Sequence, residues 1–162
     1  MVGNGRRVKI NLIAIGKKMP DWIQTGITHY QKQLPRELNF NLTTPEAQKR
    51  KSKNIEQIKQ LEGELLMKAS ATANLIIAFD EHGKQHSTKE IAQAMQNWQQ
   101  NGDSVALLIG GADGLSNTIK QQAHQLWGLS NLTLPHSIAR LLAVEQIYRA
   151  HSLLTNHPYH RE

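Results

Sequence analysis

The last seven residues of the chain, at positions 156–162, bring together side chains that could recognise a nucleotide. Their sequence is Asn-His-Pro-Tyr-His-Arg-Glu. A tyrosine ring can stack on a base, and an arginine can hold a phosphate. Tyr159, His160 and Arg161 are therefore candidate RNA-binding residues. An ordinary frayed end, which usually carries polar residues, is the competing interpretation.

Three other candidate segments lie where an apolar run gives way to turn residues, at 79–83, 109–114 and 129–137. Ligands of open α/β sheets bind beside the carboxyl ends of strands, so we expect a ligand site where these segments meet. The paired Gly110 and Gly111 would let a flat ligand approach the backbone, although a tight turn alone also explains them. Their spacing matches neither the G-x-G-x-x-G dinucleotide motif nor a P-loop.

The charged side chains near these segments favour structural roles over acid–base or metal chemistry. Asp80 and Glu81 are adjacent, and neighbouring residues of an extended segment point in opposite directions, so we expect bonds to nearby backbone rather than a shared site. The eight histidines form no compact ligand pattern, and no metal is expected. Glu145 and Arg149 have the spacing of a helical ion pair. Arg140, just before them, could face an anionic substrate.

Apolar, β-rich runs alternate with longer helical patterns along the whole chain. Asn54 is suited to cap one helix, and Ser87 with Glu90 forms a capping box for another. Such alternation predicts an α/β fold, with right-handed βαβ units, a mostly parallel sheet and helices on both faces. The expected strands are 8–15, 38–43, 74–79, 105–109 and 129–134, and the expected helices are 21–34, 54–70, 87–98, 116–128 and 137–154.

Positive charge is concentrated in the first third of the chain. The 162 residues carry 19 Lys+Arg and 13 Asp+Glu, a formal net charge of +6. Residues 1–53 alone hold 11 of the basic residues and three acids, which gives this segment +8. The densest cluster is Lys49, Arg50, Lys51 and Lys53. Such a field favours a polyanion such as RNA, while a solvated basic loop without a partner is the alternative.

Length and composition narrow the class of protein. A chain of this length suits one domain, which we place at residues 8–162, after a flexible leader at 1–7. The absence of cysteine excludes disulfides, thiolate metal sites and a cysteine nucleophile. It also fits a cytoplasmic protein. No apolar stretch approaches the roughly 20 residues that a membrane span needs, so no membrane partner is expected.

Four segments, taken together, carry a specific resemblance. They are IGKKMPDWIQTGITHY at 15–30, LLIGGADGLS at 107–116, LSNLTLPHSIARLLAVEQIYRA at 129–150 and NHPYHRE at 156–162. Their order and spacing resemble the RlmH family, also called YbeA-like, of the SPOUT superfamily of RNA methyltransferases. The resemblance covers about residues 8–162.

The resemblance implies a fold and a reaction that composition and periodicity do not reveal. It implies a C-terminal trefoil knot, a homodimer, and S-adenosyl-L-methionine as the methyl donor, with S-adenosyl-L-homocysteine as the product. The implied reaction methylates N3 of a pseudouridine in 23S rRNA, preferably in the assembled ribosome, and needs no metal. Where the family often has Pro and Glu, this chain has Ala112 and Asp113. These departures should adjust the turn without abolishing cofactor binding.

Matching the motifs residue by residue assigns roles. Tyr159, His160 and Arg161 become candidate catalytic residues, with Tyr159 stacking or hydrogen bonding, His160 accepting a proton, and His160 or Arg161 stabilising negative charge. In a dimer this tail could complete the pocket of the other subunit. A ribosome-binding protein without catalysis, or a SPOUT methyltransferase of another RNA, are the alternatives. His136 and Arg140 lie beside the cofactor segment and are the second group of expected substrate contacts. The matched cofactor positions are Phe79, Gly110, Leu129, Ser130, Asn131, Leu132, Thr133 and Leu134.

Overall fold

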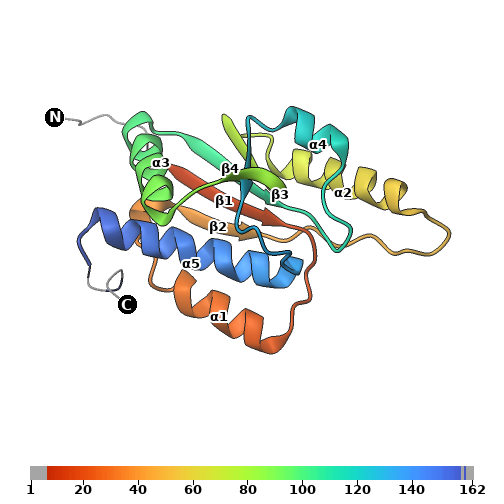
Figure 1. Cartoon of the computed structure of the whole chain (residues 1–162), viewed down its shortest axis with the longest axis horizontal. Helices are drawn as coiled ribbons and strands as arrows, with labels where there is room; N and C mark the ends of the chain where they lie inside the picture. The colour runs from red at the N-terminus through yellow and green to blue at the C-terminus, as the bar shows by residue number, and fades with distance from the viewer. Residues whose placement is uncertain (1–6, 158, 160–162) are drawn as a thin grey trace.

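The computed structural model describes residues 7–157 and residue 159. Within these residues the chain forms a five-stranded parallel sheet in the order β2-β1-β4-β3-β5 (Figure 1). This confirms the α/β class, whereas the leader lies, apart from Arg7, outside the described part and stays a prediction. The strands are β1 (Lys9–Ala14), β2 (Phe40–Thr43), β3 (Leu75–Gln85), β4 (Ser104–Ile109) and β5 (Gln125–Gly128).

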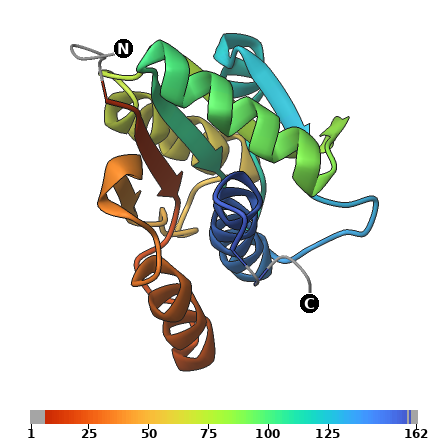
Figure 2. The ribbon, with the colours of Figure 1, turned by 90° about the vertical axis from the view of Figure 1, so that its left-hand side faces the viewer.

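Helices cover both faces of the sheet (Figure 1 and Figure 2). On one face α1, α3 and α5 share a core with Leu12 and Leu107, and on the other α2 and α4 pack with Ile13 and Leu108. Successive side chains of a strand point to opposite faces, so continuous apolar runs are needed to fill both cores. The helices are α1 (Asp21–Gln31), α2 (Ile55–Ala69), α3 (Thr88–Asn101), α4 (Asn117–Gln122) and α5 (His136–Leu154), and a 3₁₀ turn spans Arg36–Leu38.

Two helices begin at the predicted caps. The Gln57 N–H donates to Asn54 Oδ1 over 2.8 Å, and the Asn54 N–H donates to Gln57 Oε1 over 3.0 Å. At α3 the Glu90 N–H donates to Ser87 Oγ over 3.1 Å, and the Ser87 N–H donates to Glu90 Oε1 over 2.8 Å. Each pair satisfies two N–H groups that a helix start otherwise leaves unpaired. The cap positions therefore fix where α2 and α3 begin.

The predicted last strand is wrong in position. The strand is β5 at Gln125–Gly128, inside the segment expected as the end of a helix, and 129–134 forms a loop. α4 ends at Gln122 because the backbone of Ala123 turns extended, with ψ of 141°. Trp127 is then buried and stacks on Trp98, with ring centroids 6.0 Å apart. Burial of this ring against α3 favours a strand where local pattern favours a helix.

The predicted end of the third strand is also wrong. β3 continues beyond Phe79 to Gln85, but its pairing with β5 is interrupted. Both Phe79 and Lys84 pair with Trp127, so residues 80–83 form an irregularity between them. Such a bulge bends a strand and re-aims its side chains. The segment expected at a strand end is therefore a bulge within the strand.

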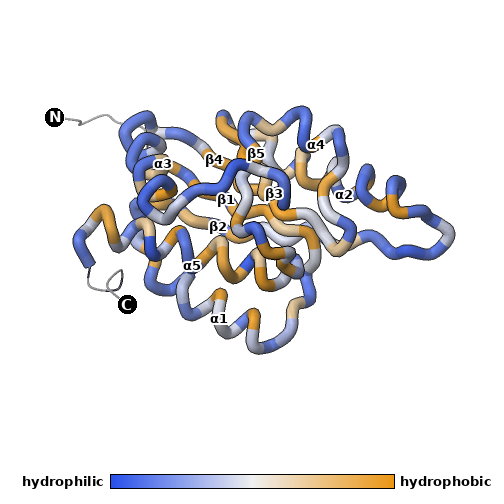
Figure 3. Tube along the Cα trace, in the orientation of Figure 1, coloured by the Kyte–Doolittle hydropathy of each residue, from blue (hydrophilic) through white to orange (hydrophobic). Residues whose placement is uncertain are grey.

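Hydrophobic residues gather along the strands and on the inner sides of the helices, while the loop before α2 is mostly hydrophilic (Figure 3).

Among the helices of the described chain, none has both the length and the apolar character needed to cross a membrane.

Gly83 lies where β3 and β5 come closest, and this generates a test of the bulge. A Cβ at Gly83 would lie 2.5 Å from the Trp127 carbonyl carbon and 2.7 Å from its nitrogen. Backbone cannot rotate away as a side chain can, so Gly83→Ala is expected to lower the free energy of unfolding by about 1–3 kcal/mol. Urea denaturation measures this, with the exposed Lys84→Ala as control. Equal losses in the two variants would contradict the geometry.

Candidate active site

A cavity of about 750 Å³ lies at the carboxyl end of β4. The three segments that the sequence singles out all contribute to its wall, together with Lys59 of α2 and Lys120 of α4. Asn131 is not among its lining residues. The structure thus brings together most of the expected cofactor residues and one expected substrate residue, which are Phe79, Gly110, Leu129, Ser130, Leu132, Thr133, Leu134 and His136.

The glycine turn, defined here as residues 110–114, forms one side of the cavity. Its ends pair through a bridge in which the Gly114 N–H donates to the Gly111 carbonyl over 3.1 Å. A Cβ at Gly110 would lie 2.7 Å from the Gly114 carbonyl oxygen, so the turn can close only with glycine there. The positive φ falls at Gly114, at 83°, and a Cβ built there meets open space. A ligand can therefore approach this backbone closely.

The loop at 129–135 forms the opposite side of the cavity. It belongs to neither a helix nor a strand, and its last residue leads into α5, where the Ala139 N–H donates to the Pro135 carbonyl over 2.9 Å. The Leu132 N–H donates to Ser130 Oγ over 2.9 Å, which turns the chain locally. Leu132 is itself 73% exposed.

Charges of both signs lie around the cavity. Asp80 Oδ1 is 3.4 Å from Lys120 Nζ, and Asp80 Oδ2 accepts from the His82 N–H over 3.1 Å. This confirms the predicted structural role for that carboxylate. Burial, and then the nearby Arg140 guanidinium, lower the pKa of His136, so its imidazole is neutral at pH 7.

Arg140 lies just beneath this region and is only 1% exposed. Its Nη2 donates to the carbonyls of Ile15 and Gly16, over 2.9 and 3.0 Å, and burial lowers its pKa. These bonds hold the end of β1 to α5 at Gly16, whose φ is 111°. In this chain Arg140 positions backbone and does not line the cavity. Its predicted contact with substrate stays a prediction.

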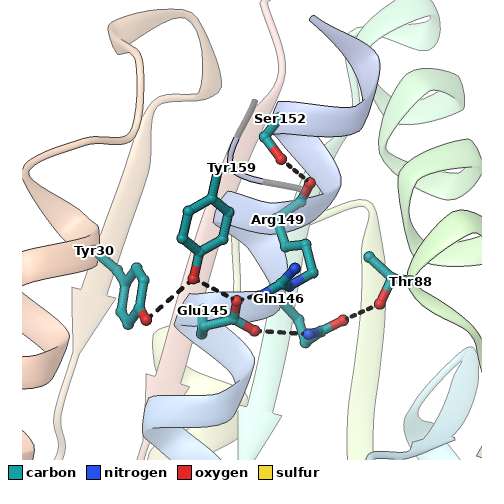
Figure 4. A network of polar contacts seen from close by, with 7 residues as sticks. All are labelled: Tyr30, Thr88, Glu145, Gln146, Arg149, Ser152 and Tyr159. Carbon is teal, nitrogen blue, oxygen red and sulfur yellow. Dashed lines mark hydrogen bonds and ion pairs between the residues drawn. The ribbon is translucent and has the colours of Figure 1, made fainter. Parts of the chain in front are cut away.

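Tyr159 lies against α1 and the middle of α5 (Figure 4). Its hydroxyl donates to Glu145 Oε2 over 2.9 Å and lies 3.1 Å from the Tyr30 hydroxyl. Arg149 Nε donates to the same Glu145 oxygen over 3.0 Å, which confirms the predicted ion pair, and its guanidinium carbon lies 4.7 Å from the Tyr159 ring centroid. Burial, and then the bonds to Tyr30 and Glu145, raise the pKa of Tyr159. The phenol therefore stays protonated at neutral pH.

The hydrogen bonds around Glu145, which join it to Tyr159 and Arg149, continue through Gln146 to α3. The Gln146 amide donates to Glu145 Oε1 over 2.7 Å, and Thr88 Oγ1 donates to Gln146 Oε1 over 2.7 Å (Figure 4). His136 at the cavity and Glu145 lie nine residues apart on α5, which corresponds to about 14 Å along a helix. Tyr159 is not a lining residue of the cavity of its own chain. His160 and Arg161 lie outside the residues that the structure describes.

Sequence reasoning missed two charged residues at this site, and it missed the contact that a third, Arg50, makes there. Lys59 of α2 and Lys120 of α4 line the cavity. Nothing in the sequence distinguishes them from other basic residues of these helices. Arg50 Nη2 donates to Asp113 Oδ1 over 2.9 Å, which joins the basic loop to the glycine turn across 63 positions. No local sequence pattern predicts a contact between residues so far apart in the chain. Over residues 7–157 and 159, no cluster of three or more histidine and acidic side chains could hold a metal ion.

The structure is that of an α/β protein whose ligand cavity lies between a glycine turn and an irregular loop at the carboxyl end of a parallel sheet. Comparison with known proteins identifies the family. Residues 8–160 match the family model described as "Predicted SPOUT methyltransferase", and the chain belongs to this family.

Two relatives cover nearly the whole chain, and both are named "Ribosomal RNA large subunit methyltransferase H". The protein of Methylobacillus flagellatus is 43% identical over 156 residues, covering 96% of this chain and 100% of its own length. That of Nitrosomonas eutropha is 46% identical over 154 residues, covering 95% and 99%.

Solved structures share the fold at lower identity. A probable methylase family protein from Haemophilus influenzae superposes with a TM-score of 0.57 at 16% identity, covering 95% of this chain and 70% of that one. A probable methyltransferase from Bordetella pertussis gives a TM-score of 0.53 at 15% identity, covering 93% and 99%. These similarities support the fold alone.

The contacts of Tyr159 lead to a stability prediction. Tyr159→Phe removes a hydrogen bond to a carboxylate, and we expect the free energy of unfolding to fall by about 1–2 kcal/mol. The matched control is Tyr148→Phe, which removes a bond of 3.0 Å to the neutral amide oxygen of Gln33 and should cost less. Urea denaturation of both variants measures the difference. An equal or smaller loss for Tyr159→Phe would contradict a tail docked on Glu145.

Proposed function

We propose that this protein methylates large-subunit ribosomal RNA, transferring a methyl group from S-adenosyl-L-methionine to N3 of a pseudouridine in 23S rRNA. The proposal places the reaction in the cytoplasm, on the assembled ribosome, with the enzyme as a homodimer. The observation that carries it is the full-length similarity, at 43–46% identity, to two relatives named for methylation of this RNA. Pseudouridine, N3 and the assembled ribosome come from the motif resemblance.

The cavity is suited to the methyl donor in size and chemistry. Its volume of about 750 Å³ lies within the range of cofactor sites. Ile109, Leu129, Leu134 and Ala139 give apolar walls for an adenine ring, and the open side of Gly114 leaves room for close approach to backbone. Charges of both signs suit the ammonium and carboxylate of the methionine part. When bound, the cofactor supplies a methyl group activated by its sulfonium charge.

The chain must then position the base and manage its proton. N3–H of a pseudouridine is a weak acid, and the nitrogen must lose this proton before or during attack. We assign the acceptor role to His160 or to solvent, and the stabilisation of negative charge on the ring to Arg161 and His160. Holding N3 in line with the methyl group contributes several kcal/mol by itself. His136 and Arg140 are the second group of proposed substrate contacts.

The separation of tail and cavity favours a site shared between two subunits. Tyr159 is bound to Glu145 and Tyr30, away from the cavity of its own chain. Leu132 at the cavity and Trp22 on α1 are both exposed, as residues covered by a partner would be in a single chain. We therefore propose that the tail of one subunit completes the cavity of the other. The proposal includes the trefoil knot of the SPOUT superfamily.

The deciding experiment is transfer of labelled methyl from S-adenosyl-L-methionine to purified ribosomes that lack the modification. Mass spectrometry of the nucleosides should find the label on N3 of a pseudouridine from 23S rRNA. Arg161→Ala should reduce turnover at least tenfold while leaving cofactor affinity unchanged. Cofactor binding without transfer would favour a ribosome-binding protein without catalysis, and transfer to tRNA alone would favour another RNA substrate.

Mixed dimers test whether the tail acts across the interface. Thr133→Trp should block the cavity, and Arg161→Ala should disable the tail, so each homodimer is inactive. If subunits mix randomly and tails act on the partner, about a quarter of the sites regain both functional parts. The measurement is methyl transfer after the two variants are co-expressed with different tags. No recovery in purified mixed dimers would show that the tail acts within its own chain.

A further inference from the structure

Two contacts tie the basic loop, defined as residues 44–54, to the glycine turn at the cavity. One is the ion pair between Arg50 Nη2 and Asp113 Oδ1, at 2.9 Å. The other is indirect, since the Gln48 N–H donates to Glu62 Oε2 over 3.0 Å and Glu62 lies directly under Gly111. The loop that carries the densest positive charge is therefore joined to the wall of the cofactor cavity.

The Gln48 contact is a fixed anchor. Glu62 is only 4% exposed, and burial raises its pKa, while the bond from Gln48 opposes that rise. A Cβ at Gly111 would lie 2.8 Å from Glu62 Oε1, so the turn rests on this carboxylate. Breaking this partly buried hydrogen bond would leave the buried Glu62 oxygen without its donor. The loop therefore stays attached at Gln48.

The Arg50 contact is an exchangeable one. The side chain of Arg50 is 60% exposed, whereas that of Asp113 is 13% exposed and lies in the cavity wall. An exposed ion pair is weak, and a phosphate oxygen competes well with a carboxylate for a guanidinium. Lys49, Lys51 and Lys53 flank Arg50 and would bring RNA phosphates to it.

We propose that Arg50 and Asp113 form a latch through which RNA binding favours the methyl donor over its product; this rests on the proposed function. S-adenosyl-L-methionine has a sulfonium and carries one more positive charge than S-adenosyl-L-homocysteine, which has a neutral thioether. While Arg50 neutralises the charge of Asp113, the cavity discriminates poorly between the cationic donor and the product. When RNA phosphates take Arg50, the Asp113 carboxylate attracts the cationic donor. Asp113 is thus a specificity-determining residue that the basic loop controls.

Calorimetry tests the latch without turnover. The dissociation constants of donor and product are measured with and without a short single-stranded RNA. In the natural protein, RNA should raise the preference for the donor about two- to fivefold, the range expected for an exposed ion pair. Arg50→Gln should show the raised preference without RNA. Asp113→Asn should show the low preference, and neither variant should respond to RNA.

Lys51→Gln is the matched control, because Lys51 lies next to Arg50 and makes no ion pair with the glycine turn among the residues described. This variant should bind RNA more weakly. Once it is saturated with RNA, it should show the full increase in preference for the donor. Failure of the natural protein to bind either cofactor form would overturn the proposed function and the latch with it. Binding of both forms with a preference that neither RNA nor Arg50→Gln changes would overturn the latch alone.

Discussion

Packing of α5 against the sheet is the constraint on which the functional parts depend. The helix lies between α1 and α3 (Figure 1), and its first residue, His136, lines the cavity. One turn later, the buried Arg140 bonds to the end of β1. Further along, Glu145 holds Tyr159. One rigid helix thus sets the distance between the cavity and the tail.

The energetics of α5 explain why it can act as this frame. All 19 of its residues are at least partly buried, and Val144 and Ala150 are fully buried in the core. Burial of a valine side chain contributes about 1.5–3 kcal/mol, and burial of an alanine methyl about 0.8 kcal/mol. Burial of Arg140 reduces this stabilisation, since taking a guanidinium out of water is costly without a carboxylate partner. Its two bonds to carbonyls compensate in part, and they fix the loop after β1 in return.

The sequence predicts the parts of the fold that local chemistry determines. Apolar runs identify β1 and β4 because their two buried faces need them, and Ser87 marks the start of α3 because capping is local. β5 escapes prediction because Gln125–Gly128 has no apolar run, and Trp127 becomes buried only when Trp98 of α3 stacks on it. The exposed Leu132 looks like a core residue in sequence, yet it lies in a loop.

The same distinction applies to the site. Convergence of 109–114 and 129–137 follows from the carboxyl ends of two parallel strands, whereas 79–83 reaches the cavity through the bulge in β3. The contact of Arg50 with Asp113 cannot be predicted, since it depends on where a loop without regular structure passes over the turn. Nor does sequence tell whether Arg140 faces a substrate or the backbone, because a buried and an exposed arginine read alike.

The contacts of Tyr159 bear on the roles proposed for the tail. Its hydroxyl is already bonded to Glu145 and Tyr30, and the Arg149 guanidinium lies over its ring. Stacking of a base on that face would require displacement of Arg149, so these contacts favour a positioning role for the ring. In the proposed mechanism, contact with the base is assigned to His160 and Arg161, two of the three residues that follow Tyr159. The docking of Tyr159 is therefore part of that proposal, because His160 follows it directly in the sequence.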